Sequence, residues 1–497
     1  MQRRIVRVVG VLFGAALSAC GQTAYFEVTD GIWENPANWS THVVPGITNS
    51  VNVTFEGRTA RITQPGAICT NLVLGYSSGE TGTVCLTTGT LYTATLQNIG
   101  RAGQGTFIQS AGTTNRYGGV YLVLGEQATG NGRYELLGGY LGPNGSATEV
   151  NVGYNGAGVF YQAGGTLDEI YIDKYLYVGR AATGNGTYVM NGGEILFTNR
   201  TYVSIGHNGI GSFIQSNGVV TVAKTFNVGK EAGGRGTFRL VGGKISSGQF
   251  TMGEKTTAAG MAYIEGGEFS TTSEGWDVGY NGTGTVWQSN GVVTQNKYFY
   301  IGRAAGSKGT YVMTGGEIAL TNANNHMYVG ENGNGTFVQS NGAVRVKNYL
   351  HVSRQTGSTG YYRITGGTVT VDTMFQLGEQ ANSNARLEVV GTNSAISAKA
   401  FAMTTNSVLR FEIATGGVTK IAVQNTATLA GKLEVAVPQK MFNQPVTILS
   451  MGSRSGTFNS VVPIFPLRAV DITYPAGAGN VVLSNFRYYT GTVIAVR

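Results

Sequence analysis

The chain has 497 residues, of which 77 are Gly and 9 are Pro; 12% of the residues are charged and 41% are hydrophobic. This composition excludes collagen, which needs a strict three-residue glycine period, and a disordered chain, which carries more charge. The formal charge of +8 includes Arg3, Arg4 and Arg7 at the start, and the remaining Lys and Arg form no cluster. Nucleic-acid binding, which requires a basic face, is therefore not expected.

Residues 1–20 have the pattern of an export signal. A basic start is followed by the apolar run VVGVLFGAAL and then by small residues. The run is too short to remain as a membrane-spanning helix, and no later stretch approaches the length of one, so no transmembrane helix is expected. Leu17-Ser18-Ala19-Cys20 resembles the bacterial lipobox, which makes Cys20 a lipidation candidate and a lipid anchor to the outer membrane an expectation. Ordinary signal-peptidase cleavage nearby is the alternative.

Residues 21–70 are predicted to form an N-terminal β cap. Trp33 and Trp39 stand on either side of a Pro turn, and two runs of alternating polarity follow. A solenoid needs an end piece that hides the open edge of its first coil, and an atypical segment suits that role. A carbohydrate-stacking role for the two Trp is the alternative.

Residues 71–403 are a repeat, which is clearest over 298–346. Each unit has a hydrophobic strand ending in Val/Ile-Gly, a polar turn, a Gly-Thr-aromatic strand, a Gly-Gly or Asn-Gly turn and a third short strand. We call the glycine that ends the first strand the marker glycine. It recurs thirteen times, about every 25 residues, at Gly75, Gly100, Gly125, Gly153, Gly179, Gly206, Gly229, Gly253, Gly279, Gly302, Gly330, Ser353 (in place of Gly) and Gly378.

Three short strands in such a period, with no helix pattern, predict an all-β fold: a parallel β-solenoid of about thirteen coils. A kelch-type propeller needs about 50 residues per blade, which is two units of this repeat. Every unit carries the same pattern at the same positions, and this argues for a period of one unit and against the propeller. Coils stacked about 4.8 Å apart would make a rod of about 60 Å.

Alternate residues of a strand face opposite sides, so each unit predicts its own interior. The aromatic residue after Gly-Thr is expected to form an inward ladder of Phe107, Tyr188, Phe213, Phe238, Tyr311 and Phe337. Repeated glutamines are expected on the same side, where their amides would bond one another across coils; they are Gln109, Gln215, Gln288 and Gln339.

The residue after the marker glycine is predicted to lie on the surface. At four successive coils it alternates in sign, as Arg303, Glu331, Arg354 and Glu379. Stacking places these positions side by side, so opposite charges there, such as Arg303 against Glu331, are expected to pair.

After Met403 the unit stops and residues 404–497 are expected to form a C-terminal β domain or a thick cap. This region holds five of the nine prolines and longer strand-like runs. Earlier in the chain, Cys69 and Cys85 occupy different phases of neighbouring units. In an exported protein they either form one disulfide or remain two buried thiols.

The units IGRAAGSKGTYVMTGGEI and VGENGNGTFVQSNGAV resemble the repeats of bacterial exported proteins known as autotransporter-associated β-strand or passenger-like proteins. The start GIWENPANW and the run TATLAGKLEV resemble ends found in that group. The resemblance implies a β-solenoid and an exported location, but no ligand. Members commonly end in a translocator barrel or a sorting helix after a Pro-Glu-Pro signal; the sequence has neither, so Cys20 would supply a replacement anchor.

Chemistry-bearing residues are sparse, so no catalytic, cofactor or metal site is expected. The cluster worth naming is 166–174, where Asp168, Asp173 and Tyr171 could contact a glycan or a cation; a solvated edge is the alternative. The four His, at 42, 207, 326 and 351, show no spacing typical of metal ligands.

Two functions follow from these patterns. The first is an exported, non-enzymatic structural or adhesive protein, which is either held at the cell surface or outer membrane or secreted. Its Tyr-rich exterior would contact glycans or other surface components. The second is a carbohydrate-active enzyme, a lyase or hydrolase of β-helix type, which would need clustered acids on one face. A location in the periplasm is a third possibility for the first function.

Overall fold

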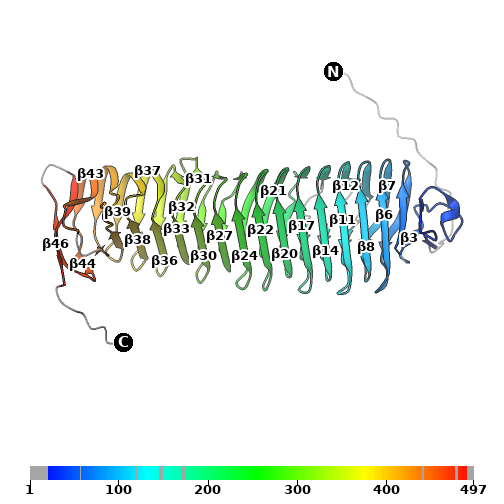
Figure 1. Ribbon diagram of the computed structural model, residues 1–497, viewed down its shortest axis with the longest axis horizontal. Coiled ribbons are helices and arrows are strands. Elements are labelled where there is room, and N and C mark those ends of the chain that lie inside the picture. The colour runs from blue at the N-terminus through cyan, green and yellow to red at the C-terminus, as the bar shows by residue number, and fades with distance from the viewer. Residues whose placement is uncertain are drawn as a thin grey trace, which may run out of the picture.

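The computed structural model describes residues 21–55, 57–117, 121–144, 149–168, 175–438, 442–475 and 479–489. They form a long rod whose strands lie across its axis, with the N-terminal coils at one end and the C-terminal coils at the other (Figure 1). The rod is a parallel β-solenoid of about 17 turns of about 25 residues, which confirms the predicted fold class. At about 4.8 Å per turn its length is about 80 Å.

One coil shows how the repeat folds. β30 (Lys308–Met313) leads through a Gly-Gly turn into β31 (Glu317–Leu320), and a bend leads into β32 (His326–Val329). The marker glycine Gly330 then turns the chain into β33 (Asn334–Gln339), directly beside β30. Equivalent strands of successive coils pair in parallel, which builds three ladders along the rod.

The first ladder contains the Gly-Thr-aromatic strands. Its members are β2 (Asp30–Ile32), β4 (Arg58–Ile62), β6 (Thr81–Leu86), β8 (Gln104–Gln109), β11 (Asn131–Leu136), β14 (Ala157–Gln162), β17 (Asn185–Met190), β20 (Ile210–Gln215), β22 (Arg235–Leu240), β24 (Ala259–Ile264), β27 (Thr283–Gln288), β30, β33, β36 (Thr359–Ile364), β38 (Asn384–Val390), β40 (Val408–Glu412), β42 (Lys432–Ala436) and β44 (Ser460–Ile464).

The second and third ladders together form the other sheet. The second ladder contains β9 (Thr113–Tyr117), β12 (Tyr140–Asn144), β15 (Thr166–Asp168), β18 (Glu194–Phe197), β25 (Glu268–Thr271), β28 (Val292–Gln295), β31 and β34 (Ala343–Val346). The third ladder contains β1 (Thr23–Tyr25), β3 (Ser50–Val53), β10 (Tyr121–Leu124), β13 (Val150–Val152), β16 (Tyr175–Val178), β19 (Tyr202–Ile205), β26 (Trp276–Val278), β29 (Phe299–Ile301), β32 and β35 (Tyr349–Val352).

Some coils join these two ladders in one long, bent strand. These strands are β5 (Ala67–Leu74), β7 (Thr90–Ile99), β21 (Val219–Val228), β23 (Lys244–Met252), β37 (Gly367–Leu377), β39 (Ser394–Met403), β41 (Ile421–Leu429) and β43 (Val446–Gly456). Register shifts at the bends, for example between Val371 and Met374, let one strand serve both ladders.

The structure has more coils than the thirteen marker glycines indicate, because the ladders run past both ends of the recognisable repeat. At the N-terminal end β1, β3 and β5 pair in parallel, and at the other end β39, which ends at Met403, continues the pairing into β41 and β43. Parallel pairing needs alternating apolar residues, not the Gly-Thr-aromatic signature, so coils without that signature still stack.

The predicted inward aromatic ladder is confirmed. Phe107, Tyr134, Phe160, Tyr188 and Phe213 are fully buried, and successive rings stack 4.7–5.0 Å apart with interplanar angles of 3–14°. Smaller side chains interrupt the stack further on; there Tyr311 packs edge to face against Phe337, and Phe337 stacks on Tyr362. This stack forms much of the hydrophobic core.

The predicted glutamines are buried, but they do not bond one another across coils. Along the first ladder a glutamine alternates with an aliphatic residue in most coils, so Gln288 stands beside Met313 and not beside another amide. Gln288 Nε2 instead donates to the carbonyls of Gly291 and Glu317, at 3.1 and 3.2 Å. Its Oε1 accepts a 2.7 Å hydrogen bond from the hydroxyl of Tyr311. Gln109, Gln162 and Gln339 repeat the contact with the tyrosine of the next coil.

A different structure covers each end of the rod: a pair of tryptophans at the N-terminal end and an antiparallel strand at the C-terminal end. Trp33 and Trp39 are fully buried and pack edge to face, and Trp39 Nε1 donates to the carbonyl of Trp33 at 2.7 Å, so neither offers a carbohydrate-stacking surface. A short 3-10 helix (Pro36–Asn38) lies between them. At the other end β46 (Asn480–Tyr488) pairs antiparallel with β43 and with β45 (Leu467–Thr473).

The two cysteines of the described chain are free thiols. Cys69 is buried in the core, and Cys85 is partly exposed on β6. Burial raises the pKa of both thiols. The disulfide that the sequence left open does not form.

Candidate functional site

The outer surface of the third ladder carries two pockets, one after the other along the rod. In β16 the side chains of Leu176 and Val178 are fully buried in the core, while Tyr175 and Tyr177 alternate with them and face outward. The residue after the marker glycine folds back over this face, so that the Arg180 guanidinium lies 4.5 Å from the centre of the Tyr177 ring. We call the outward residues of the third ladder, with the residue after each marker glycine, the third-ladder groove.

The marker glycine makes this fold-back possible. Gly302 has a φ of 74°, and a Cβ there would lie 2.3 Å from the carbonyl oxygen of Asn334 in the next coil. Both the backbone angle and the lack of space require glycine. Ser353 is the exception among the marker positions. It adopts the same left-handed backbone, with a φ of 59°, and its hydroxyl forms a 2.7 Å hydrogen bond with the hydroxyl of Ser358 in the same turn.

An aromatic cluster lies in the N-terminal half of the groove. The ring of Tyr175 stacks on Tyr177 at 4.9 Å and on Tyr202 of the next coil at 4.7 Å. The Lys230 ammonium lies 4.6 Å from the centre of the Tyr175 ring, and His207 packs edge-on against Tyr177. Burial, with the nearby charge of Lys230, lowers the pKa of His207 to about 4, so this cluster holds a neutral imidazole at pH 7.

A second aromatic cluster lies about 19 Å further along the rod, four coil steps from Tyr202. Its members come from three successive coils and are Tyr298, Tyr300, His326, Tyr328, Tyr349 and His351. Tyr300 stacks on Tyr328 at 5.2 Å, and His326 stacks on Tyr349 at 5.0 Å, both nearly parallel.

Between the clusters the groove is polar. A pocket of about 250 Å³ is lined by Tyr175, Tyr202, Thr225, Asn227, Lys230, Gln249, Thr251, Glu254 and Tyr280. Asn227 is buried, and its amide donates to the carbonyl of Val203, while its Oδ1 has no hydrogen-bond partner. A buried amide oxygen without a partner is a position where a ligand hydroxyl could donate.

A second pocket, of about 280 Å³, lies toward the N-terminal end of the groove. It is lined by Leu96, Tyr121, Val123, Glu126, Asn151, Tyr154 and Arg180. The Oδ1 of Asn151 accepts a 2.8 Å hydrogen bond from Arg180, but its Nδ2 has no partner. Tyr121 is 43% exposed, so its ring is available to a ligand.

The arginines of the groove are paired with acids of the groove. Their contacts are Arg101 with Glu126 at 3.2 Å, Arg180 with Glu149 at 2.5 Å, Arg303 with Asp277 at 2.9 Å, and Arg354 with Glu331 and Glu379 at 3.2 and 3.1 Å. The expected alternation is thus seen around Arg354. Arg303, expected to pair with Glu331, binds Asp277 of the preceding coil instead, because that carboxylate is buried beneath it.

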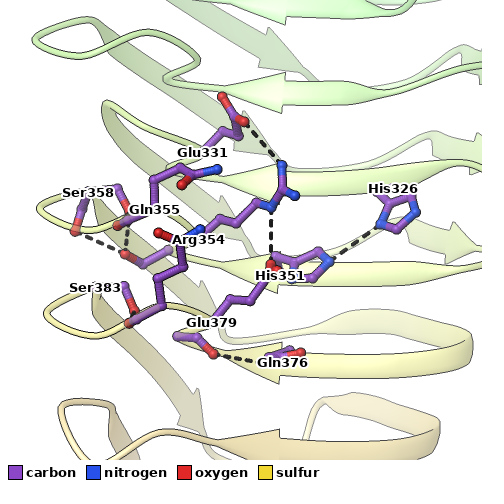
Figure 2. Close-up of polar contacts among 12 residues, drawn as sticks. His326, Glu331, His351, Arg354, Gln355, Ser358, Gln376, Glu379 and Ser383 are labelled. Carbon is purple, nitrogen blue, oxygen red and sulfur yellow. Dashed lines mark hydrogen bonds and ion pairs between the residues drawn. The ribbon is translucent and has the colours of Figure 1, made fainter.

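Figure 2 shows the end of the groove around Arg354, where two histidines join the polar network. His326 Nδ1 lies 3.4 Å from His351 Nε2, and His351 Nδ1 lies 3.1 Å from Glu379 Oε2. Burial, together with the neighbouring His351, lowers the pKa of His326 to about 4. The bond from His351 lowers the pKa of Glu379. At neutral pH this end therefore holds a neutral His326 and an ionised Glu379, with His351 between them.

Two acids lie at the middle of the groove. Asp277 is 1% exposed, and its carboxylate accepts hydrogen bonds from Gln249 Nε2 at 2.8 Å and Arg303 Nη1 at 2.9 Å. Burial raises its pKa to about 6 despite these partners, and burial also raises the pKa of Glu254. Because both oxygens of Asp277 are engaged by protein groups, its first role is to hold Arg303 and Gln249 in place.

Of the three predicted contact residues, Asp168 is among the described residues. Asp168 ends β15 in the second ladder and accepts a 2.9 Å hydrogen bond from the Tyr140 hydroxyl. Asp173 and Tyr171 lie outside the described residues, as does Cys20 with the rest of the predicted export signal. The structure therefore places Asp168 on a different face from the groove and leaves the other predicted contacts as predictions.

The groove itself was not anticipated, although the sequence carries its signal. His326 and His351 are 25 residues apart, which is one coil, so parallel stacking makes them neighbours. Metal ligands are usually recognised in a sequence by separations of only a few residues, so a pair that is 25 residues apart is missed by that criterion. The outward tyrosines recur one coil apart in the same way, and only the register of the third ladder shows that they share one surface.

Comparison with family models, with curated proteins and with solved structures gives no match. The resemblance to autotransporter-associated repeats therefore rests on the repeat motifs alone. Among the described residues no group of three or more His, Cys, Asp or Glu side chains is arranged to hold a metal ion. The described residues also include no helix that is long and apolar enough to cross a membrane.

Proposed function

We propose that the protein is an exported β-solenoid of the cell envelope or surface, which acts as a structural or adhesive element and binds glycan chains in the third-ladder groove without cleaving them. The observation that carries the proposal is the groove itself. It combines tyrosine faces with buried amides, of which Asn151 and Asn227 each leave one polar atom without a partner. Aromatic faces and amides are the groups that bind sugar rings and hydroxyls.

The location is supported by residues 1–20 and by the repeat motifs, and a rod of about 80 Å suits a protein that projects from a surface. Protease treatment of intact cells that express the full chain tests it. The chain should be digested from outside, and mass spectrometry of its N-terminus should reveal a diacylglycerol on Cys20 if that anchor is used. Protection from protease until the outer membrane is opened would place the protein in the periplasm.

A carbohydrate-active enzyme is the second candidate, and Asp277 with Glu254 is the observation that favours it, since both carboxyls lie in the groove with raised pKa values. The engaged oxygens of Asp277 favour binding over catalysis. Incubation of the full chain with polysaccharides, followed by measurement of reducing ends and of unsaturated products, separates the two. No release is expected; release that Asp277→Asn abolishes while the variant stays folded would establish the enzyme.

A further inference from the structure

We infer that the third-ladder groove takes a neutral, linear polysaccharide laid along the rod axis. This inference rests on the proposed glycan-binding function and adds to it the charge class and the direction of the ligand.

The charge class follows first from the state of the arginines. Arg180 and Arg303 each contact an acid within 3 Å and also lie within 5.1 Å of the centres of two tyrosine rings. A polyanion would have to displace these carboxylates, and removing a partner from a half-buried ion pair is costly. The ammonium of Lys230 lies 3.2 Å from the hydroxyl of Tyr175, against a ring and beside Glu254. Among the described residues, the groove therefore offers no row of free cations for an anionic chain.

The buried amides give a second, independent indication. Asn151 leaves an N–H donor without a partner, whereas Asn227 leaves a carbonyl acceptor. Each is at least nine-tenths buried and lines a pocket of the groove. A sugar hydroxyl both donates and accepts, so it can satisfy either atom, while a carboxylate or sulfate only accepts and would leave Asn227 unsatisfied. Both pockets together therefore fit a ligand rich in hydroxyls.

The direction of the ligand follows from the ladder. A strand such as β16 presents two outward residues, so a chain that lay along a strand would leave the groove after about 13 Å. Along the rod, outward tyrosine rings instead recur in four successive coils, at Tyr121, Tyr154, Tyr175 and Tyr202, and again after two polar coils at Tyr280. An extended ligand contacts all of these tyrosines only if it runs across the strands.

The test measures binding of the full chain to hexasaccharides of one charge class at a time. The neutral probes are cellohexaose, laminarihexaose, xylohexaose and mannohexaose; the anionic probes are hexagalacturonate, hexamannuronate and a heparin-derived hexasaccharide. At least one neutral probe should bind, at least tenfold more tightly than any anionic one, and about equally in low and high salt. Its trisaccharide should bind at least tenfold more weakly.

Tyr280→Ala and Tyr121→Ala, one in each pocket, should each weaken that binding at least tenfold. Tyr161→Ala is the matched control, since this tyrosine also faces outward beside an arginine, Arg133, but on the first ladder, and it should change binding less than twofold. Circular dichroism and thermal unfolding check that every variant keeps its fold.

Each contrary result has a defined meaning. Tighter binding of an anionic probe, lost in high salt and sensitive to Tyr280→Ala, would overturn the neutral class while leaving glycan binding in the groove intact. Equal binding of the trisaccharide and hexasaccharide would overturn the axial direction. Binding of no glycan of either class, or capture of a protein ligand that Tyr280→Ala abolishes, would overturn the proposed function together with this inference.

Discussion

Tyrosines of the first-ladder interior and tyrosines of the third-ladder groove occupy two contrasting environments in the same repeat. Tyr311 is fully buried, and its hydroxyl donates to Gln288 of the preceding coil. Tyr300 faces outward, and its ring packs against the Arg303 guanidinium. Inside, the hydroxyl must be satisfied by one fixed partner, because no water reaches it. Outside, the ring lies on the surface of the rod, and a cation packs against it.

The contrast shows how a single short repeat can encode a core and a tyrosine-rich outer surface at once. Strand alternation assigns each position to one side, and parallel stacking then repeats that assignment along the rod. Changes in the interior should therefore lower stability, whereas changes to the outward tyrosines should mainly weaken the proposed glycan binding.

The largest expected effect comes from the turn that joins the two environments. Gly302→Ala puts a Cβ 2.3 Å from the Asn334 carbonyl oxygen at a φ of 74°, and should destabilise by about 4 kcal/mol or more, since the next coil must move. Gly306→Ala is a matched control with a φ of 79° and open space around its Cβ, and should cost only about 1 kcal/mol. Urea unfolding compares them; equal losses would mean that the backbone angle alone, and not the stacking, requires the marker glycine.

The buried acid of the groove should give stability a defined pH dependence. The pKa of Asp277 is about 6 in the folded chain and about 4 in the unfolded chain, so its contribution is fully present below pH 4 and lost as the pH rises through 6. Between pH 4 and pH 7, the free energy of unfolding of the unsubstituted protein should fall by up to about 3 kcal/mol relative to that of the Asp277→Asn variant. Asp471→Asn is the control: Arg487 lowers the pKa of Asp471, so the contribution of this carboxylate is lost only as the pH falls below about 4 and should stay nearly constant between pH 4 and pH 7. If the difference in unfolding free energy between the unsubstituted protein and Asp277→Asn did not change with pH, the Asp277 carboxylate would be as well stabilised in the groove as in water.

The interior hydroxyl–amide pair should behave as one unit. Gln288→Leu leaves the Tyr311 hydroxyl buried without its acceptor and should cost about 2 kcal/mol. Adding Tyr311→Phe should restore part of that loss, because both polar groups are then gone, as in coils that carry an aliphatic residue at this position. Thermal unfolding of the two single variants and the double variant measures the coupling. Additive losses would contradict the assignment of the two groups to one pair.

The smallest effect is expected on the outer surface of the second ladder. Lys244 and Glu268 lie 3.0 Å apart, but both side chains are more than half exposed. Lys244→Ala should therefore change the free energy of unfolding by less than about 0.5 kcal/mol. A loss comparable to that of the interior variants would mean that surface pairs help to hold the coils in register.

Several residues of the interior could be predicted from the sequence because strand alternation alone places them. The inward aromatic ladder and the buried glutamines are of this kind. The partners of those glutamines could not be predicted in the same way, because they depend on which residue stands beside each amide in the next coil. The pairing of Arg303 with Asp277 rather than Glu331 has the same origin: burial of one carboxylate decided between two stacked neighbours.

The period and the polarity of the repeat, by themselves, determined a parallel solenoid, its marker turns and its aromatic core, since each depends on contacts within a coil or between equivalent positions. Only the tertiary structure decided how far the ladders extend, because coils that lack the repeat motif still stack through alternating apolar residues. It also decided where the surface chemistry gathers. The groove joins side chains that are a full coil apart in sequence, and their common face is set by the register of the third ladder and by the fold-back at residues such as Gly302.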